Sequence, residues 1–166
     1  AFDAGALFRS GRLRVMPAVG TELAKLPVPI AAEFWDGNRW LTHTSDSCTE
    51  LPAAAIAQGN YLRNLGSCET APGSGALTLN QGRAFITLAK PGVGNAGSVD
   101  LTLQLGDTAS GQRCSAVGAA ATSAVSAGLS WLQGKWQNAS TLTANPVARI
   151  SFGQVRSPVI YMREIY

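Results

Sequence analysis

The sequence predicts an all-β protein, an antiparallel β-sandwich with long loops rich in glycine, alanine and serine and with at most short helical turns. Apolar and polar residues alternate with a period of two in several segments, and residues typical of turns bound these segments. No strand-like segment is followed by a helical pattern of about ten to fifteen residues, as a parallel α/β sheet would require. With 166 residues, the chain is expected to form one domain, residues 1–166.

A β-hairpin is predicted over residues 28–42. Every second residue from Val28 to Phe34 is apolar, and Asp36-Gly37-Asn38 supplies residues suited to a tight turn. The apolar pattern resumes after this turn. Trp35 and Trp40 are therefore expected to flank the turn.

A second hairpin is predicted from residues 76–79 and 84–88, which flank Asn80-Gln81-Gly82-Arg83. Residues 99–105 give the clearest half-buried strand. Four of them are expected to face the core (Val99, Leu101, Leu103 and Leu105), and three to face solvent or a second layer (Asp100, Thr102 and Gln104). Residues 147–152 and 159–166 complete the predicted strands, and a short helix or 3₁₀ turn is predicted within residues 51–57.

The composition excludes several classes of protein. Charged residues make up only 14% of the chain and hydrophobic residues 46%, which excludes a disordered tail and a charge-rich coiled coil. The net charge is +3, and most basic residues are scattered singly, so no nucleic-acid partner is expected. The densest basic cluster is Arg9, Arg12 and Arg14, where Arg12 and Arg14 are expected on the solvent side of a strand. No segment is apolar for long enough to predict a membrane span.

The three cysteines predict a disulfide rather than a metal site. Cys48 and Cys68 would close a loop of about twenty residues, which leaves Cys114 either buried as a small apolar residue or bridged in place of Cys68. A zinc site from the three cysteines and His43 is arithmetically possible but lacks closely spaced ligand pairs. We therefore expect no metal and no cofactor.

The sequence predicts no catalytic residues. Gly92-Val93-Gly94-Asn95-Ala96-Gly97 has the spacing of a dinucleotide-binding loop, but a strand pattern follows it where a helix would be needed. His43 is the only histidine. It would pair with Asp46 and a serine in a hydrolytic triad, but a surface position is the expected one.

The four tryptophans allow two interpretations. The favoured one is that Trp35, Trp40, Trp131 and Trp136 fill the core of the sandwich or its end. The alternative is that they are exposed, where they would stack on sugar rings or anchor a partner protein.

Several short segments together resemble one family. They are Phe8-Arg9-Ser10-Gly11-Arg12-Leu13-Arg14, Leu26-Pro27-Val28-Pro29, Glu33-Phe34-Trp35-Asp36-Gly37, Asp46-Ser47-Cys48-Thr49, Trp131-Leu132, Asn145-Pro146-Val147-Ala148-Arg149, Phe152-Gly153 and Tyr161-Met162-Arg163-Glu164-Ile165-Tyr166. In this order they resemble the C-terminal domain of MshQ-like proteins, large exported proteins of Gram-negative bacteria associated with mannose-sensitive haemagglutinin (type IV) pili. The resemblance implies an extracellular or outer-surface location, a role in pilus biogenesis or adhesion and no enzymatic activity. It also supports the participation of Cys48 in a bridge.

The expected function is therefore that of a non-enzymatic extracellular surface domain, the C-terminal part of a larger exported protein. One alternative is a self-assembling fibre subunit, in which a sheet edge or the strand-like segments Ala6 to Val15 and Val159 to Tyr166 complete a neighbour's sheet. The other is a carbohydrate-binding module that uses the tryptophans. The expected partners are accordingly other pilus or surface proteins, copies of the same chain, or glycans.

Overall fold

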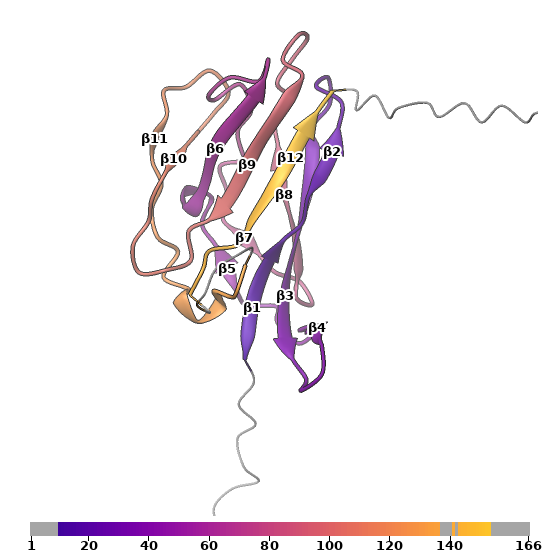
Figure 1. The fold of residues 1–166 in the computed structure, drawn as a ribbon, viewed down its shortest axis with the longest axis vertical. Helices are drawn as coiled ribbons and strands as arrows, with labels where there is room; N and C mark the ends of the chain where they lie inside the picture. The colour runs from indigo at the N-terminus through magenta and orange to yellow at the C-terminus, as the bar shows by residue number, and fades with distance from the viewer. Residues whose placement is uncertain (1–9, 137–140, 142, 154–166) are drawn as a thin grey trace, which may run out of the picture.

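The computed structural model describes residues 10–136, 141 and 143–153, which fold into a β-sandwich (Figure 1). Its strands are β1 (Gly11–Val15), β2 (Ala18–Gly20), β3 (Leu26–Trp35), β4 (Trp40–Thr42), β5 (Glu50–Leu51), β6 (Ile56–Arg63), β7 (Leu77–Thr78), β8 (Arg83–Leu88), β9 (Gly97–Leu103), β10 (Gln112–Arg113), β11 (Thr122–Ser123) and β12 (Val147–Phe152). The helical segments of this part of the chain are two 3₁₀ turns, η1 (Ala53–Ala55) and η2 (Ser130–Leu132). The predicted all-β class is confirmed, and η1 lies within residues 51–57, where a short turn was expected.

Two sheets form the layers of the sandwich. One has the strand order β11-β10-β6-β9-β12-β2, and in the other β3 pairs with β1 on one side and with β4 and β8 on the other. In Figure 1, β6, β9 and β12 lie side by side in front of β8. The orders β1-β3-β8 and β6-β9-β12 match the A-B-E and C-F-G orders of immunoglobulin-type sandwiches.

The first part of the chain belongs to both sheets. β1 runs antiparallel to β3, from Gly11 opposite Phe34 to Val15 opposite Ile30. After Met16 and Pro17 the chain enters the other sheet, where β2 runs parallel to β12. This crossing joins the two layers along one side of the sandwich.

The core lies between the sheets and follows the alternation in the sequence. Val99, Leu101, Leu103 and Leu105 are fully buried, as predicted. Apolar side chains of β3, β8 and β12 meet them from both layers. Each such side chain contributes about 1.5–3 kcal/mol through removal from water.

Gln104 departs from the expected pattern, because it is buried with only 2% of its surface exposed. Its side-chain oxygen accepts hydrogen bonds from the Ser110 amide at 3.1 Å and from Nδ2 of Asn145 at 3.2 Å. A buried polar group is tolerated when it is hydrogen-bonded in this way.

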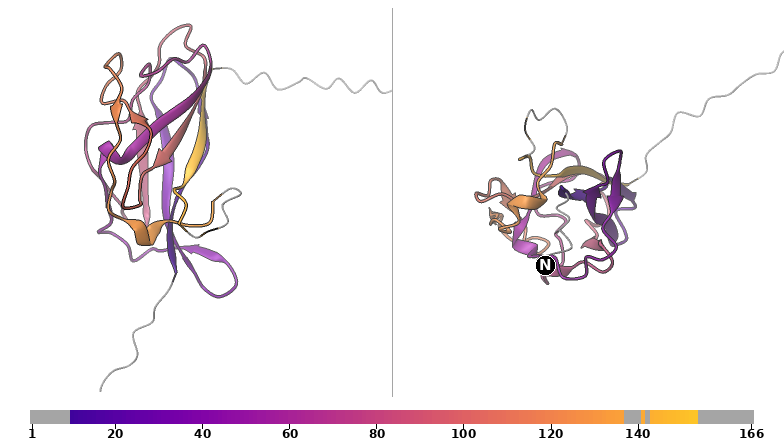
Figure 2. Two further views of the ribbon diagram at one scale, coloured as in Figure 1. Left: turned by 60° about the vertical axis from the view of Figure 1, so that its left-hand side comes forward. Right: turned by 90° about the horizontal axis from the view of Figure 1, so that it is seen from below.

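The hairpin over residues 28–42 is confirmed. β3 pairs with β4, and Trp35 lies opposite Trp40 across the turn. The turn projects beyond the sheets in the left view of Figure 2.

The predicted second hairpin has the expected turn but different partners. Asn80 and Arg83 exchange two backbone hydrogen bonds around Gln81 and Gly82, both of which have positive φ. At Gly82 an added Cβ would lie only 2.9 Å from the carbonyl carbon of His43, so glycine is required there. Beyond the turn the strands separate, since β7 pairs with β5 and β8 with β3.

The predicted Cys48–Cys68 bridge is wrong in its pairing. Cys68 is bonded to Cys114, 46 residues later, and Cys48 is an exposed free thiol. The reason is the pairing of β10 with β6, which brings Cys114 beside the loop after β6, with the Cα atoms 5.2 Å apart. A loop of this length stabilises the fold by about 4 kcal/mol in the chain-entropy account.

Two further expectations concern particular segments. The glycine-rich loop of residues 92–97 lies between β8 and β9, and Gly97 begins β9, so a strand follows this loop as predicted. Residues 159–166 and Ala6 to Arg9 lie outside the described residues. None of the helical segments in the described ranges is long and apolar enough to cross a membrane.

Candidate ligand-binding site

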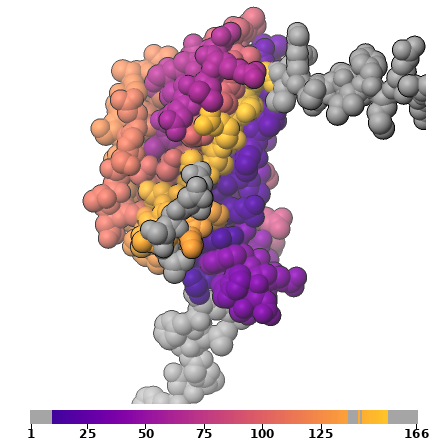
Figure 3. Space-filling view, in the orientation of Figure 1, coloured from indigo at the N-terminus to yellow at the C-terminus, as the bar shows by residue number. Residues whose placement is uncertain are grey.

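The four tryptophans lie outside the core, which corrects the interpretation of them as core residues. Trp131 is 68% exposed and Trp35 39%, while Trp40 and Trp136 are partly buried. The elements that carry them, the β3–β4 hairpin and η2 with the segment after it, gather at the lower end of the sandwich in Figure 1. The hairpin forms the purple lobe at that end in Figure 3. The tryptophans lie at the end of the sandwich, which was the second position expected for them.

The β3–β4 turn holds two indole rings side by side. The ring centroids of Trp35 and Trp40 are 5.6 Å apart, and the ring planes are inclined by 57°. Asp36 fixes the turn, because its Oδ1 accepts hydrogen bonds from the amides of Asn38 and Arg39, both at 2.8 Å. These bonds, the one from Arg39 first, lower the pKa of Asp36.

Arg12 lies on the outer face of β1, opposite the buried Leu13 and Val15 as predicted, but two tryptophans cover it there instead of solvent. Its guanidinium carbon is 4.0 Å from the ring centroid of Trp40 and 4.4 Å from that of Trp136. Such cation–π contacts strengthen when the cation is removed from water, and the Arg12 side chain is only 15% exposed.

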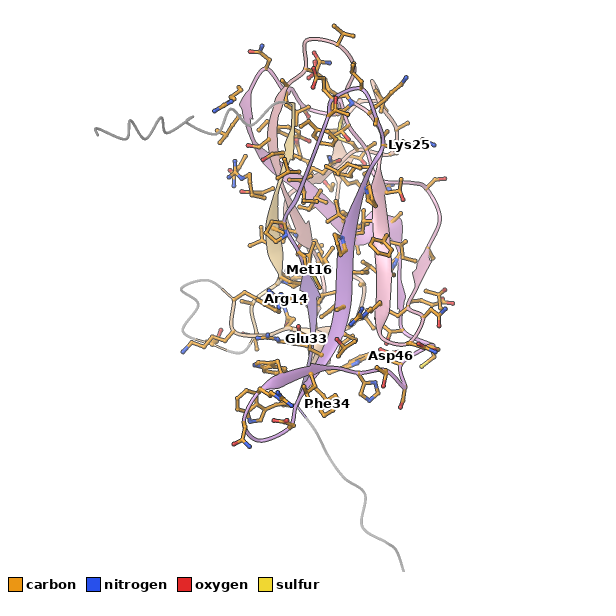
Figure 4. The ribbon with its side chains drawn as sticks, turned by 90° about the vertical axis from the view of Figure 1, so that its right-hand side faces the viewer. Arg14, Met16, Lys25, Glu33, Phe34 and Asp46 are labelled. Atoms are coloured by element: carbon orange, nitrogen blue, oxygen red, sulfur yellow. A yellow bond between two sulfur atoms is a disulfide. The ribbon has the colours of Figure 1, made fainter. Side chains whose placement is uncertain are left out.

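Glu33 forms an ion pair with Arg12. The two residues lie directly opposite each other on β3 and β1, and both Nε and Nη2 of Arg12 are 2.7 Å from Oε2 of Glu33. Arg14 approaches Oε1 of the same carboxylate at 3.4 Å. Figure 4 shows Arg14 and Glu33 on one face of the molecule. Since the Glu33 side chain is only 9% exposed, these arginines supply the partners that a buried carboxylate requires.

A hollow of about 440 Å³ opens beside these groups, lined by Ser10, Arg12, Trp35, Trp40 and Lys135. We call these five residues together with Trp136 the Trp–Arg site. The site combines the exposed Trp35 ring on the β3–β4 hairpin with two basic side chains, Arg12 on β1 and Lys135 in the segment after η2. Groups of these kinds suit a ligand that has both a flat face and polar edges.

A second hollow, of about 310 Å³, opens at the same end and is lined in part by His43, Asp46, Cys48 and Trp131. The His43 ring meets Phe34 edge to face, with centroids 5.6 Å apart. Among the described residues no hydrogen bond joins this ring to Asp46 or to a serine hydroxyl. The groups named for a hydrolytic triad are therefore near one another without the geometry of one.

Asp46 instead organises its own loop. Its carboxylate accepts hydrogen bonds from the Thr49 hydroxyl at 2.8 Å, the Thr49 amide at 3.0 Å and the Cys48 amide at 3.3 Å. Burial raises the pKa of Asp46, but these hydrogen bonds and the charge attraction of His43 outweigh burial, so the net pKa is lowered.

The cysteines expected to act together lie apart. Cys48 lines the second hollow, whereas Cys68 and Cys114 form a small buried cluster of their own with Ala71. In the described ranges no group of three or more His, Cys, Asp or Glu side chains is placed to hold a metal ion. Sequence reasoning missed the Arg12–Glu33 pair, although an acidic residue in an apolar strand and two arginines spaced by two residues were the signal for it.

Many cell-surface domains share the sandwich architecture seen here. The chain belongs to the family described as DUF6701, fourth domain, whose model matches residues 9–165. That description mentions neither a ligand nor pili. No curated protein and no solved structure matches the chain.

Proposed function

We propose that the chain is a non-enzymatic surface domain that binds a carbohydrate at the Trp–Arg site. The observation that carries this proposal is the exposed Trp35 ring beside Trp40, next to a hollow of about 440 Å³. Tryptophan has a large apolar face and one polar edge, so it stacks on the C–H face of a sugar while the sugar hydroxyls stay in water. It also loses little conformational entropy on binding.

The contacts that hold Trp40 in place favour a binding role for the exposed rings over accidental exposure. Trp40 rests on Arg12, and Arg12 is fixed by Glu33 on the neighbouring strand. A ring held by packing and by an ion pair is already in place before the ligand arrives, which lowers the entropy cost of binding.

The proposed location is the outside of the cell. The disulfide is compatible with an oxidising compartment, and the low charge of the chain agrees with it. A role in type IV pilus biogenesis or adhesion is the finer part of the proposal and rests on the resemblance to MshQ-like proteins alone.

The test is glycan binding by the wild-type domain and two matched tryptophan variants. A glycan array followed by calorimetry should find a saturable sugar ligand, and Trp35→Ala should weaken its binding about tenfold or more. Trp131→Ala is the control, because Trp131 is even more exposed but does not line the Trp–Arg site. Absence of any glycan ligand, or equal losses in both variants, would contradict the proposal.

A second candidate function is self-assembly through strand addition, and the open edge of β8 favours it. β8 pairs with β3 on one side, and within the described ranges its other side is bridged at its two ends, Arg83 to Asn80 and Leu88 to Pro72. Phe85, earlier in the strand, is 57% exposed. An edge of this kind accepts a strand from another copy of the chain. Light scattering should then show concentration-dependent oligomers that Phe85→Lys abolishes, and a monomer at all concentrations would exclude this candidate.

A further inference from the structure

We infer that the ligand of the Trp–Arg site is an acidic sugar, one whose ring carries a carboxylate. The inference rests on the proposed carbohydrate binding and adds the charge of the ligand. It follows from the charges that line the hollow, from the state of the nearby carboxylates and from the shape of an acidic sugar.

The lining of the hollow is basic. Among the lining residues that the structure describes, Arg12 and Lys135 are cationic, and the other three are uncharged. Lys135 is exposed, and no ion pair to it is present among the described residues. A hollow whose described lining holds two cations and no carboxylate attracts an anion, and low-dielectric walls such as indole rings strengthen that attraction.

The nearest carboxylates do not cancel this charge. Glu33 is shared between Arg12 and Arg14, so two cations face one anion there. Asp36 lies 3.7 Å from Nε of Arg39 and accepts two backbone amides. Around the Trp–Arg site the cations Arg12, Arg14, Arg39 and Lys135 therefore outnumber the carboxylates Glu33 and Asp36, and Lys135 is an exposed cation that lines the hollow.

The arrangement of rings and cations fits a sugar acid better than a simple anion. Arg12 is held between two indole rings and has little freedom to close on a small ion. A uronic or sialic acid has an apolar ring face and a carboxylate at the rim of the ring. Stacking of that face on Trp35 places the carboxylate at the edge of the hollow, where Lys135 lies. A neutral sugar would use the ring alone.

The experiment compares acidic and neutral sugars of matched size by calorimetry. One arm uses trigalacturonic acid against galactotriose, and the other uses sialyllactose against the neutral trisaccharide fucosyllactose, so the arms separate a uronic acid from a sialic acid. In the arm that contains the sugar acid recognised by the site, the acidic sugar should bind about tenfold more tightly than its neutral counterpart. The difference should shrink at high salt, because Lys135 is exposed.

Charge-reversal variants locate the effect. Lys135→Glu should weaken the binding of the acidic sugar about tenfold and so remove its preference over the neutral one. Lys25→Glu is the matched control, since Lys25 is also exposed and Figure 4 shows it at the opposite end from Glu33 and Phe34. Circular dichroism checks that each variant is folded.

Two outcomes would overturn the inference, and they differ in what they leave standing. Equal binding of acidic and neutral sugars, unchanged in Lys135→Glu, removes the acidic preference but leaves carbohydrate binding intact. Failure of every sugar to bind, with Trp35→Ala indistinguishable from wild type, removes the carbohydrate function and the inference with it.

Discussion

Two arginine–carboxylate pairs lie on the outer faces of the two sheets, and they differ in what covers them. Arg149 and Asp100 are directly opposite on β12 and β9, and their side chains are 39% and 16% exposed. Arg12 and Glu33 are directly opposite on β1 and β3, but their side chains are only 15% and 9% exposed. Trp40 and Trp136 account for the difference, because they enclose the Arg12 guanidinium and keep water away from it.

The comparison shows that the same kind of cross-strand ion pair has different effects on stability when it is exposed and when it is covered. An open pair contributes little, because water competes for both charges. A covered pair is costly to break, because removing one partner leaves the other charge buried. The covered pair therefore fixes the position of the rings above it, whereas the open pair is hydrogen-bonded to the polar residues Asn60 and Ser98.

The largest effect is expected from removing the carboxylate of the covered pair. Glu33→Ala should lower the free energy of unfolding by about 3 to 5 kcal/mol, because Arg12 is left buried without its partner. Asp100→Ala, the matched change in the open pair, should cost about 1 kcal/mol or less. Urea denaturation measures both losses of unfolding free energy. Equal losses would show that the tryptophans do not shield the Arg12–Glu33 pair from water.

A smaller effect on the free energy of unfolding is expected from removing one of the two indole rings that cover Arg12. Trp40→Leu removes one of the two rings on Arg12 and should cost about 1 to 2 kcal/mol. In this background Glu33→Ala should cost less than in the wild type, because water then reaches Arg12. A double-mutant cycle measures this coupling, and additive losses would contradict the role given to the ring.

The smallest effect outside the two ion pairs is expected at Asp46, a carboxylate held by hydrogen bonds from neutral groups and without an arginine. Asp46→Asn should cost about 1 kcal/mol at neutral pH. Because the folded-state pKa lies below the usual value of 3.8, this contribution is present above that pH and disappears as the pH falls through the lowered pKa. Urea denaturation of both proteins between pH 7 and the acid range checks this, and a difference that stays constant throughout would contradict it.

The parts of the fold that depend on local pattern could be predicted from the sequence. The alternation from Val99 to Leu105 gives the buried face of β9 because side chains in a strand point to opposite faces in turn. The turn at Asp36 follows from residues that tolerate its backbone conformation. Both depend on neighbours in the chain.

The parts that depend on distant contacts could not be predicted in the same way. Cys68 meets Cys114 only because β10 pairs with β6. Likewise, β7 does not continue the hairpin with β8, because it pairs with β5 instead. Arg12 looked like a solvent-facing residue because alternation predicts the side of the strand and not what lies on that side. Trp136 covers it from a segment more than a hundred residues later.

The crossing of the first strand between the sheets affects how the domain bears load. β2, near the start of the fold, runs parallel to β12 at its end, with Ala18 opposite Ile150 and Gly20 opposite Phe152. Tension applied to the chain before β2 and after β12 pulls these strands past each other in opposite directions. The hydrogen bonds between them are then strained together in shear instead of opening one after another as a zipper does. A domain built in this way resists stretching along the seam between β2 and β12.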